Sequence, residues 1–134
     1  RGVCAEYCGT QHAKMAFEVV ALPPAEYAAW VEARRRPHPE PTGEALRGRE
    51  LFFAAACHNC HAVRDTPAVG LVGPDLTHMG SRRTIGAATV PNTYDNLFRW
   101  IRDPHLDKPG NRMPHSTLPD ADIAAITTYL ESLK

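Results

Sequence analysis

The 134-residue sequence has no long hydrophobic segment: its longest uninterrupted apolar run extends from Leu51 to Cys57. A helix that spans a bilayer needs roughly 20 apolar residues, so we expect no transmembrane helix in this stretch of chain. The sequence also begins with Arg1 rather than methionine and contains no recognisable signal peptide. We interpret it as a processed or excised piece of a longer protein.

The sequence also has no excess of charge of either sign. Its 15 Lys and Arg residues balance 15 Asp and Glu residues. Non-specific binding to nucleic acid needs a basic field, so we expect no nucleic acid partner. Hydrophobic residues make up 43% of the chain and charged residues 22%. This ordinary globular composition argues against global disorder.

Sequence patterns predict mostly helices. We expect helices over 25–36, 42–56 and 94–103, and a last helix that begins at Pro119, each recognised by caps or by apolar residues that share a face. The apolar stripe of the last helix consists of Ile123, Ile126, Leu130 and Leu133. Alternating and β-branched residues over 15–22 predict one strand.

A basic, proline-rich segment divides the chain. Arg34-Arg-Arg-Pro-His-Pro-Glu-Pro41 is typical of a semi-rigid linker, and its three arginines are too few to favour a lipid-binding tract. We therefore predict an N-terminal unit over 1–33, a linker over 34–42 and a second domain over 43–134.

The strongest motif is Cys57-His58-Asn59-Cys60-His61, which is C-x-x-C-H, the attachment pattern of c-type haem. Two thiols three residues apart can add to the two vinyl groups of a porphyrin, and His61 then supplies a nitrogen ligand to the iron. A zinc site would need a second ligand pair, and a redox C-x-x-C would need a βαβ context that is absent here. We expect His58, inside the motif, to face solvent.

The sixth ligand of the iron is predicted to be Met113. It lies on the long loop before the last helix, opposite the attachment motif, whereas Met15 belongs to the N-terminal unit and Met79 is expected to pack in the core. His115 is the best rival. A Met/His pair raises the reduction potential relative to two histidines and fills both axial positions, which suits an electron carrier rather than a catalyst.

A second cluster of metal-binding residues lies near the N-terminus. Cys4-Ala-Glu-Tyr-Cys8-Gly-Thr-Gln-His12-Ala-Lys-Met15 combines two thiols, an imidazole and a thioether within twelve residues. This soft ligand set favours copper. The alternative is a disulfide between Cys4 and Cys8.

Residues 42–134 resemble a class I cytochrome c, a mainly α fold with three main helices around a covalent haem. The resemblance implies that the Gly73-Pro74 loop orients His61 through a backbone carbonyl, with Pro74 packed on the haem ring. It also implies that Gly48 and Phe52 cross the last helix near Tyr129.

Haem propionates need paired donors when they are buried. Arg82, Arg83, Thr84 and Trp100 are the candidates for these hydrogen bonds. The alternative is that the two arginines are simply solvated.

The segment from Cys4 to Met15 resembles the ligand loop of the dinuclear copper site CuA. The resemblance implies that Cys4 and Cys8 bridge the coppers, that His12 and Met15 are terminal ligands, and that Glu6 contributes its backbone carbonyl. The family has a further histidine ligand on an earlier strand, and most of its cupredoxin barrel is also missing here. We therefore expect a truncated cupredoxin β remnant that does not hold the copper pair by itself.

The order of copper loop, helix, linker and cytochrome resembles the C-terminal part of subunit II of a haem–copper cytochrome c oxidase with a fused cytochrome c domain, the caa-type. This implies electron flow from an external donor, such as a cytochrome or a quinol-oxidising complex, through haem c and CuA to subunit I, which reduces oxygen with proton pumping. It also implies a bacterial membrane complex, anchored through the missing N-terminal part, with this domain on the extracytoplasmic side.

Two other functions are compatible with the motifs. One is a CuA-containing nitrous oxide reductase with a cytochrome c tail, and the other is a free-standing mono-haem electron carrier. Glu6 between the two cysteines favours the oxidase.

Overall fold

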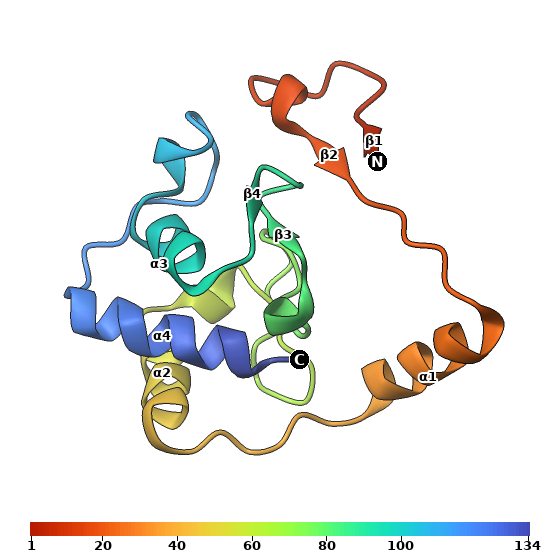
Figure 1. Ribbon diagram of the computed structural model, residues 1–134. Coiled ribbons are helices and arrows are strands. Elements are labelled where there is room, and N and C mark those ends of the chain that lie inside the picture. Colours follow the sequence, from red (N-terminus) through yellow and green to blue (C-terminus); the bar gives the residue numbers. More distant parts are fainter.

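The computed structural model describes residues 1–134 and is mainly helical (Figure 1). The α-helices are α1 (Pro24–Arg35), α2 (Gly43–Ala54), α3 (Tyr94–Arg102) and α4 (Asp120–Ser132). Short 3₁₀ helices are η1 (His12–Lys14), η2 (Cys57–Asn59), η3 (Met79–Ser81) and η4 (Pro104–Leu106). The strands form two antiparallel ribbons, β1 (Gly2–Val3) with β2 (Ala16–Phe17) and β3 (Thr84–Ile85) with β4 (Val90–Pro91).

The core lies where α2 crosses α4 (Figure 1). Gly48 lets the two backbones approach closely, because a Cβ at this position would lie 1.9 Å from the carbonyl oxygen of Ala125. One turn later, Phe52 meets Tyr129 edge to face, with ring centroids 5.8 Å apart. This crossing is the one implied by the cytochrome c resemblance, and the predicted stripe of α4 is buried within it.

Helix α3 begins with a cap and packs on α4. The Thr93 hydroxyl accepts a hydrogen bond from the Asn96 amide at 3.3 Å, which satisfies one of the free amides of the first turn. Leu97 and Ile101 are buried in the core, and Trp100 packs against it. The two ends of α3 therefore lie within one residue of the predicted range.

The predicted strand over 15–22 is wrong for most of its length. Only Ala16–Phe17 form a strand, because their partner β1 is itself only two residues long. The following residues have no strand to pair with, and Val19 remains 75% exposed. The alternating pattern was correct for an extended segment, but pairing depends on a neighbouring strand that this chain does not supply.

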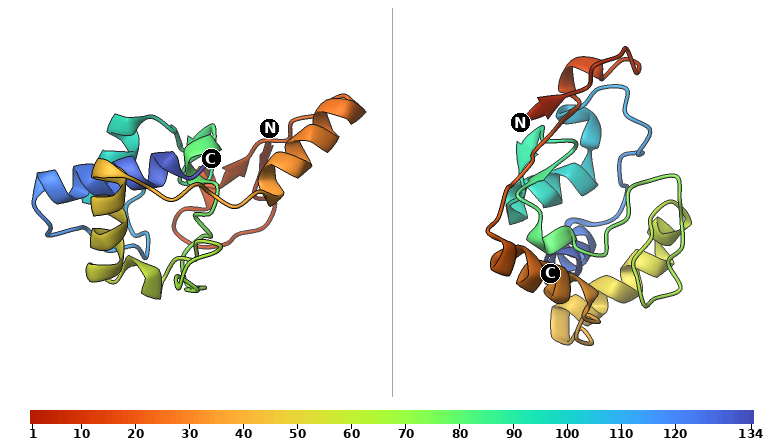
Figure 2. Two further views of the ribbon diagram at one scale, coloured as in Figure 1. Left: turned by 90° about the horizontal axis from the view of Figure 1, so that it is seen from below. Right: turned by 90° about the vertical axis from the view of Figure 1, so that its right-hand side faces the viewer.

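Helix α1 stands apart from the core (Figure 2). Tyr27 and Trp30 stack on its exposed surface. Its C-terminal end is attached to the C-terminal part of the chain by a hydrogen bond from Arg34 to Ser81 and by one from Arg64 to the Arg36 carbonyl at 3.0 Å. No helix in the structure is both long enough and apolar enough to cross a bilayer.

The replacement Gly48→Ala tests the α2–α4 crossing. Intrinsic helix propensity favours alanine by up to about 1 kcal/mol, whereas overpacking against the Ala125 carbonyl costs about 1–3 kcal/mol. We expect the clash to win, so chemical denaturation should give a lower free energy of unfolding. Glu50→Ala, on the exposed side of the same helix, is the control. A stabilised Gly48→Ala protein would contradict the close crossing.

Candidate metal centres

The C-x-x-C-H segment follows α2 after one sharp turn. Ala56 adopts a left-handed backbone conformation, with φ of 59°, and η2 begins immediately after it. The carbonyl of Cys57 accepts hydrogen bonds from the amides of Cys60 at 3.2 Å and His61 at 3.0 Å. Both cysteines are free, and burial raises the pKa of the Cys57 thiol. The motif therefore presents two free thiols and an imidazole on one compact turn.

Two glycines let the following loop close over this turn. A Cβ on Gly70 would lie 2.5 Å from the Cys60 carbonyl carbon, and a Cβ on Gly73 would lie 2.5 Å from Cε1 of His61. The Gly73 amide donates to the Cys60 carbonyl at 2.7 Å. Only glycine fits positions where backbone and ring approach this closely.

The imidazole of His61 is oriented by the next residue of the loop. Its Nδ1 lies 2.8 Å from the carbonyl oxygen of Pro74. Because a carbonyl only accepts hydrogen bonds, Nδ1 carries the proton and Nε2 keeps its lone pair free for a metal. This is the hydrogen bond that the cytochrome c resemblance implied.

The surroundings of His61 fit a c-type haem. A porphyrin presents broad apolar faces, and the loop that encloses His61 exposes three apolar side chains, Val69 and Val72 at 76% and Leu71 at 91%. Together with two free thiols and an imidazole with an available Nε2, these residues match the chemistry of covalent haem attachment.

The three methionines lie in different environments. Met79 is 4% exposed and belongs to the hydrophobic core, as predicted. Met113 is partly exposed on the loop between η4 and α4, where its amide donates to Oδ1 of Asn111 at 2.6 Å. Met15 lies among the N-terminal cysteines. Met113 remains our prediction for the sixth iron ligand, and its rival His115 is exposed on the same loop.

The propionate candidates remain a prediction. Arg82 donates to the carbonyl of Asp75, and burial lowers the pKa of its guanidinium. Arg83 is exposed, Thr84 lies in β3, and the Trp100 ring covers Gly86.

The expectation that His58 faces solvent is wrong. Its ring centroid lies 5.1 Å from that of Phe53, and its Nδ1 is buried without a hydrogen-bond partner. His58 packs in this way because Phe53, near the end of α2, lies beside the attachment motif.

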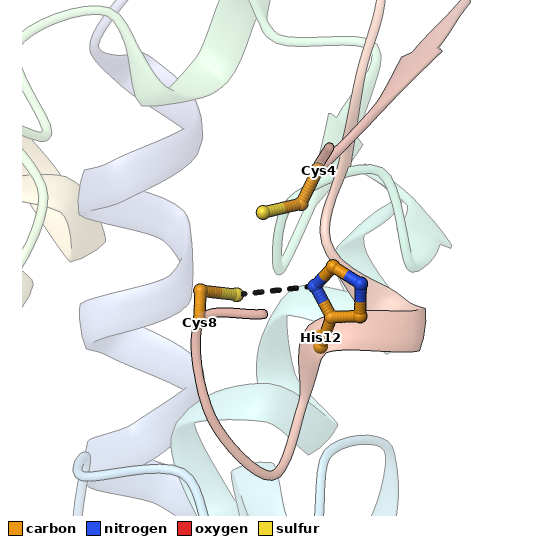
Figure 3. A group of neighbouring side chains, drawn as sticks. All are labelled: Cys4, Cys8 and His12. Carbon is orange, nitrogen blue, oxygen red and sulfur yellow. Dashed lines mark hydrogen bonds between the residues drawn. The ribbon is translucent and has the colours of Figure 1, made fainter. Parts of the chain in front are cut away.

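The N-terminal cysteines converge with the other predicted copper ligands. Metal-binding atoms of Cys4, Cys8 and His12 lie within 4.8 Å of one another (Figure 3). The Cys8 sulfur lies 3.7 Å from Nδ1 of His12 and 3.4 Å from Sδ of Met15. The Cys4 thiol donates to the Glu6 carbonyl at 3.0 Å. Each of the five predicted ligands thus contacts at least one other, and the thiols, imidazole and thioether fit copper.

Backbone contacts close this loop. The Cys4 amide donates to the Met15 carbonyl at 2.9 Å, next to the β1–β2 pair. The two thiols are free, so the alternative disulfide is not formed in this structure. The hydrogen bond with Cys4, with burial and charge repulsion from Cys4 as lesser causes, raises the pKa of the Cys8 thiol. A bound cation would reverse this effect by favouring the thiolate.

A family model described as cytochrome c matches residues 45–134, a stretch that includes the attachment motif and Met113. The chain belongs to the cytochrome c family. This confirms the predicted mainly helical cytochrome c fold, in which α2, α3 and α4 are the three main helices.

Three curated relatives, each named cytochrome c oxidase subunit 2, match nearly the whole chain. The protein of Alkalihalophilus pseudofirmus is 43% identical over 136 residues and aligns with 100% of this chain. Those of Bacillus sp. strain PS3 and Bacillus subtilis are 38% and 32% identical over 139 residues and align with 99% of it. The chain spans 39% of the length of each relative. The resemblance to oxidase subunit II is confirmed.

Replacing Gly73 with alanine tests the orientation of His61. The new methyl group would occupy the position of the imidazole ring, so we expect a loss of about 1–3 kcal/mol in stability. We also expect the haem potential to rise, because the Pro74 hydrogen bond that makes His61 a stronger donor would be lost. Pro67→Ala, at an exposed position of the same loop, is the control in both redox titration and denaturation. An unchanged potential would contradict the proposed geometry.

Proposed function

We propose that this chain is the electron-entry region of a cytochrome c oxidase subunit II. Cys57 and Cys60 hold haem c covalently, His61 and Met113 are its axial ligands, and the haem passes electrons from an external donor to copper. The observation that carries the haem assignment is the hydrogen bond from Nδ1 of His61 to Pro74, because it leaves Nε2 free beside two unpaired thiols. The bound haem supplies the one-electron redox chemistry.

We propose that Cys4, Cys8, His12, Met15 and the Glu6 carbonyl are copper ligands of a CuA centre in the complete subunit. The support is the convergence of their donor atoms, together with relatives named oxidase subunit 2 that align with this segment as well as with the cytochrome domain. The expected division at residues 33 and 42 separates the two metal-binding units.

The partners proposed for the complete protein follow from this assignment. An external donor reduces the haem, and copper passes the electron to subunit I, where oxygen is reduced to water with proton pumping. The parent complex is proposed to sit in a bacterial membrane with this region on the extracytoplasmic side. The alignment of oxidase subunits across the whole chain favours this function over a nitrous oxide reductase tail or a free-standing carrier.

Met113 and the core residue Met79 allow a matched test of the haem assignment. Met113→Leu in the assembled oxidase should remove an iron ligand, change the spectrum of the ferric haem and reduce turnover with reduced donor at least about tenfold. Met79→Leu removes the same sulfur from a buried core position, where such a swap costs under about 1.5 kcal/mol, and should leave both properties unchanged. Equal effects of the two replacements would contradict the assignment of Met113.

The two cysteine pairs allow a second test, by elemental analysis of the complete subunit. Cys8→Ser should abolish the bound copper and leave iron at its wild-type level, because a serine hydroxyl is a poor ligand for a soft metal. Cys60→Ser should remove one haem thioether bond and leave copper unchanged. Loss of both metals in either variant, with the fold intact by circular dichroism, would mean that the two sites are not separate.

A further inference from the structure

The copper-ligand segment, defined here as residues 1–17, lies directly on the cytochrome domain. It contacts the turn between β3 and β4 and the loop after η4, as two views show (Figures 1 and 2). Six hydrogen bonds cross this contact. Two of them, from Thr89 Oγ1 and Lys108 Nζ, are donated to the Lys14 carbonyl. The other four are Ala16 N to Ala87 O at 3.1 Å, Arg1 Nη2 to Ala88 O at 3.3 Å, Lys14 Nζ to Asp107 O at 2.7 Å, and Gln11 Nε2 to Pro109 O. Two segments that the sequence separates by about 70–100 residues are thereby joined.

Lys108 lies at the centre of this contact. The residue is only 8% exposed, and its ammonium group donates to the carbonyls of Lys14 at 2.8 Å and Gly86 at 3.0 Å. The neighbouring Asp107 does not neutralise it, because that carboxylate is paired with Arg99. A buried ammonium without its hydrogen bonds is costly, so the Lys14 carbonyl is a partner that Lys108 needs. One side chain therefore ties together its own loop, the β3–β4 turn and the copper-ligand segment.

The β3–β4 turn, which takes part in the same contact, has a strained backbone. Ala87 and Ala88 have φ of 60° and 58°, in the left-handed region that is sterically unfavourable for a residue other than glycine. Such backbone conformations persist where the surrounding structure holds them. Here Thr89 donates to the Gly86 carbonyl at 2.6 Å, and the Ala87 carbonyl accepts the hydrogen bond from Ala16. The turn is held in the conformation that receives the copper-ligand segment.

We propose that Lys108 is the positioning residue that fixes the copper-ligand segment on the cytochrome domain, beside the loop that carries Met113. This inference rests on the proposed function, because it assigns the geometry between the two metal centres. On one side Lys108 contacts the carbonyl of Lys14, the neighbour of Met15. On the other side its own carbonyl accepts from the Asn111 amide at 3.2 Å, and Asn111 in turn holds the Met113 amide.

Amide hydrogen exchange in the haem-loaded 134-residue chain tests this role. The Ala16 amide reports the contact, because its acceptor belongs to the cytochrome domain. Lys108→Met keeps the apolar stem and removes the charged donor, and it should speed exchange at Ala16 at least about tenfold. Lys134→Met is the matched control, because it removes the same charge from an exposed position. The spectrum of the methionine-ligated ferric haem and slow exchange in α4 verify the fold. Unchanged exchange at Ala16 with an intact fold would overturn the proposal.

A reciprocal experiment leaves Lys108 in place and therefore does not depend on the folding of its variant. Ala16→Pro removes the amide that donates to Ala87 and alters only the copper-ligand segment. It should raise the labelling rate of the Lys108 amine by an acetylating reagent several-fold, with Lys134 in the same molecule as the reference. An unchanged Lys108 rate would overturn the proposal. Neither experiment uses copper or electron transfer, so failure of the proposed function, seen as no haem-to-copper transfer in the wild-type subunit, is a separate outcome.

Discussion

The hydrogen bond between His61 and the Pro74 carbonyl sets the arrangement of the cytochrome domain. For this bond to form, the loop after the attachment motif must turn back onto the motif, which requires glycine at positions 70 and 73. The attachment motif follows α2, so its orientation depends on the close crossing of α2 and α4 at Gly48. A single such bond contributes only about 1 kcal/mol of net stability. Its larger effect is to fix the tautomer and direction of the imidazole, and iron ligation depends on both.

The copper-ligand segment adds a second constraint. This segment has no hydrophobic core of its own, because none of its residues is buried. Its position therefore depends on polar contacts with the cytochrome domain. Lys108 supplies the most enclosed of these contacts. A tethered carrier gains effective concentration only if the tether lets the two sites meet. Here the chain from β2 through α1 to α2 loops away from the core, and both of its ends return to it (Figure 1).

Local signals in the sequence were enough to predict the four α-helices and the grouping of Cys4, Cys8 and His12. The cap at Thr93, the stripe of α4 and the C-x-x-C-H spacing each act within a few residues. Features that depend on distant partners were not predicted. The strand predicted over 15–22 is only two residues long in the structure, because its partner strand is equally short. The β3–β4 ribbon was not predicted, because its strands are too short to show a sequence pattern.

The contact made by Lys108 could not be predicted either. Its partner is a backbone carbonyl 94 positions away, which carries no signal in a side-chain pattern. From the sequence alone, Lys108 would be expected to be an ordinary surface lysine in a polar loop. Only its burial in the folded protein distinguishes it from Lys134.

We propose that the haem and the copper site form one intramolecular electron-transfer unit. The most direct test is to reduce the haem rapidly in the complete, metal-loaded subunit and to follow oxidation of the haem and reduction of copper over a wide range of protein concentration. A single first-order rate that is independent of concentration is the result this account predicts. A rate that rises in proportion to protein concentration, or a haem that stays reduced beside oxidised copper, would contradict it.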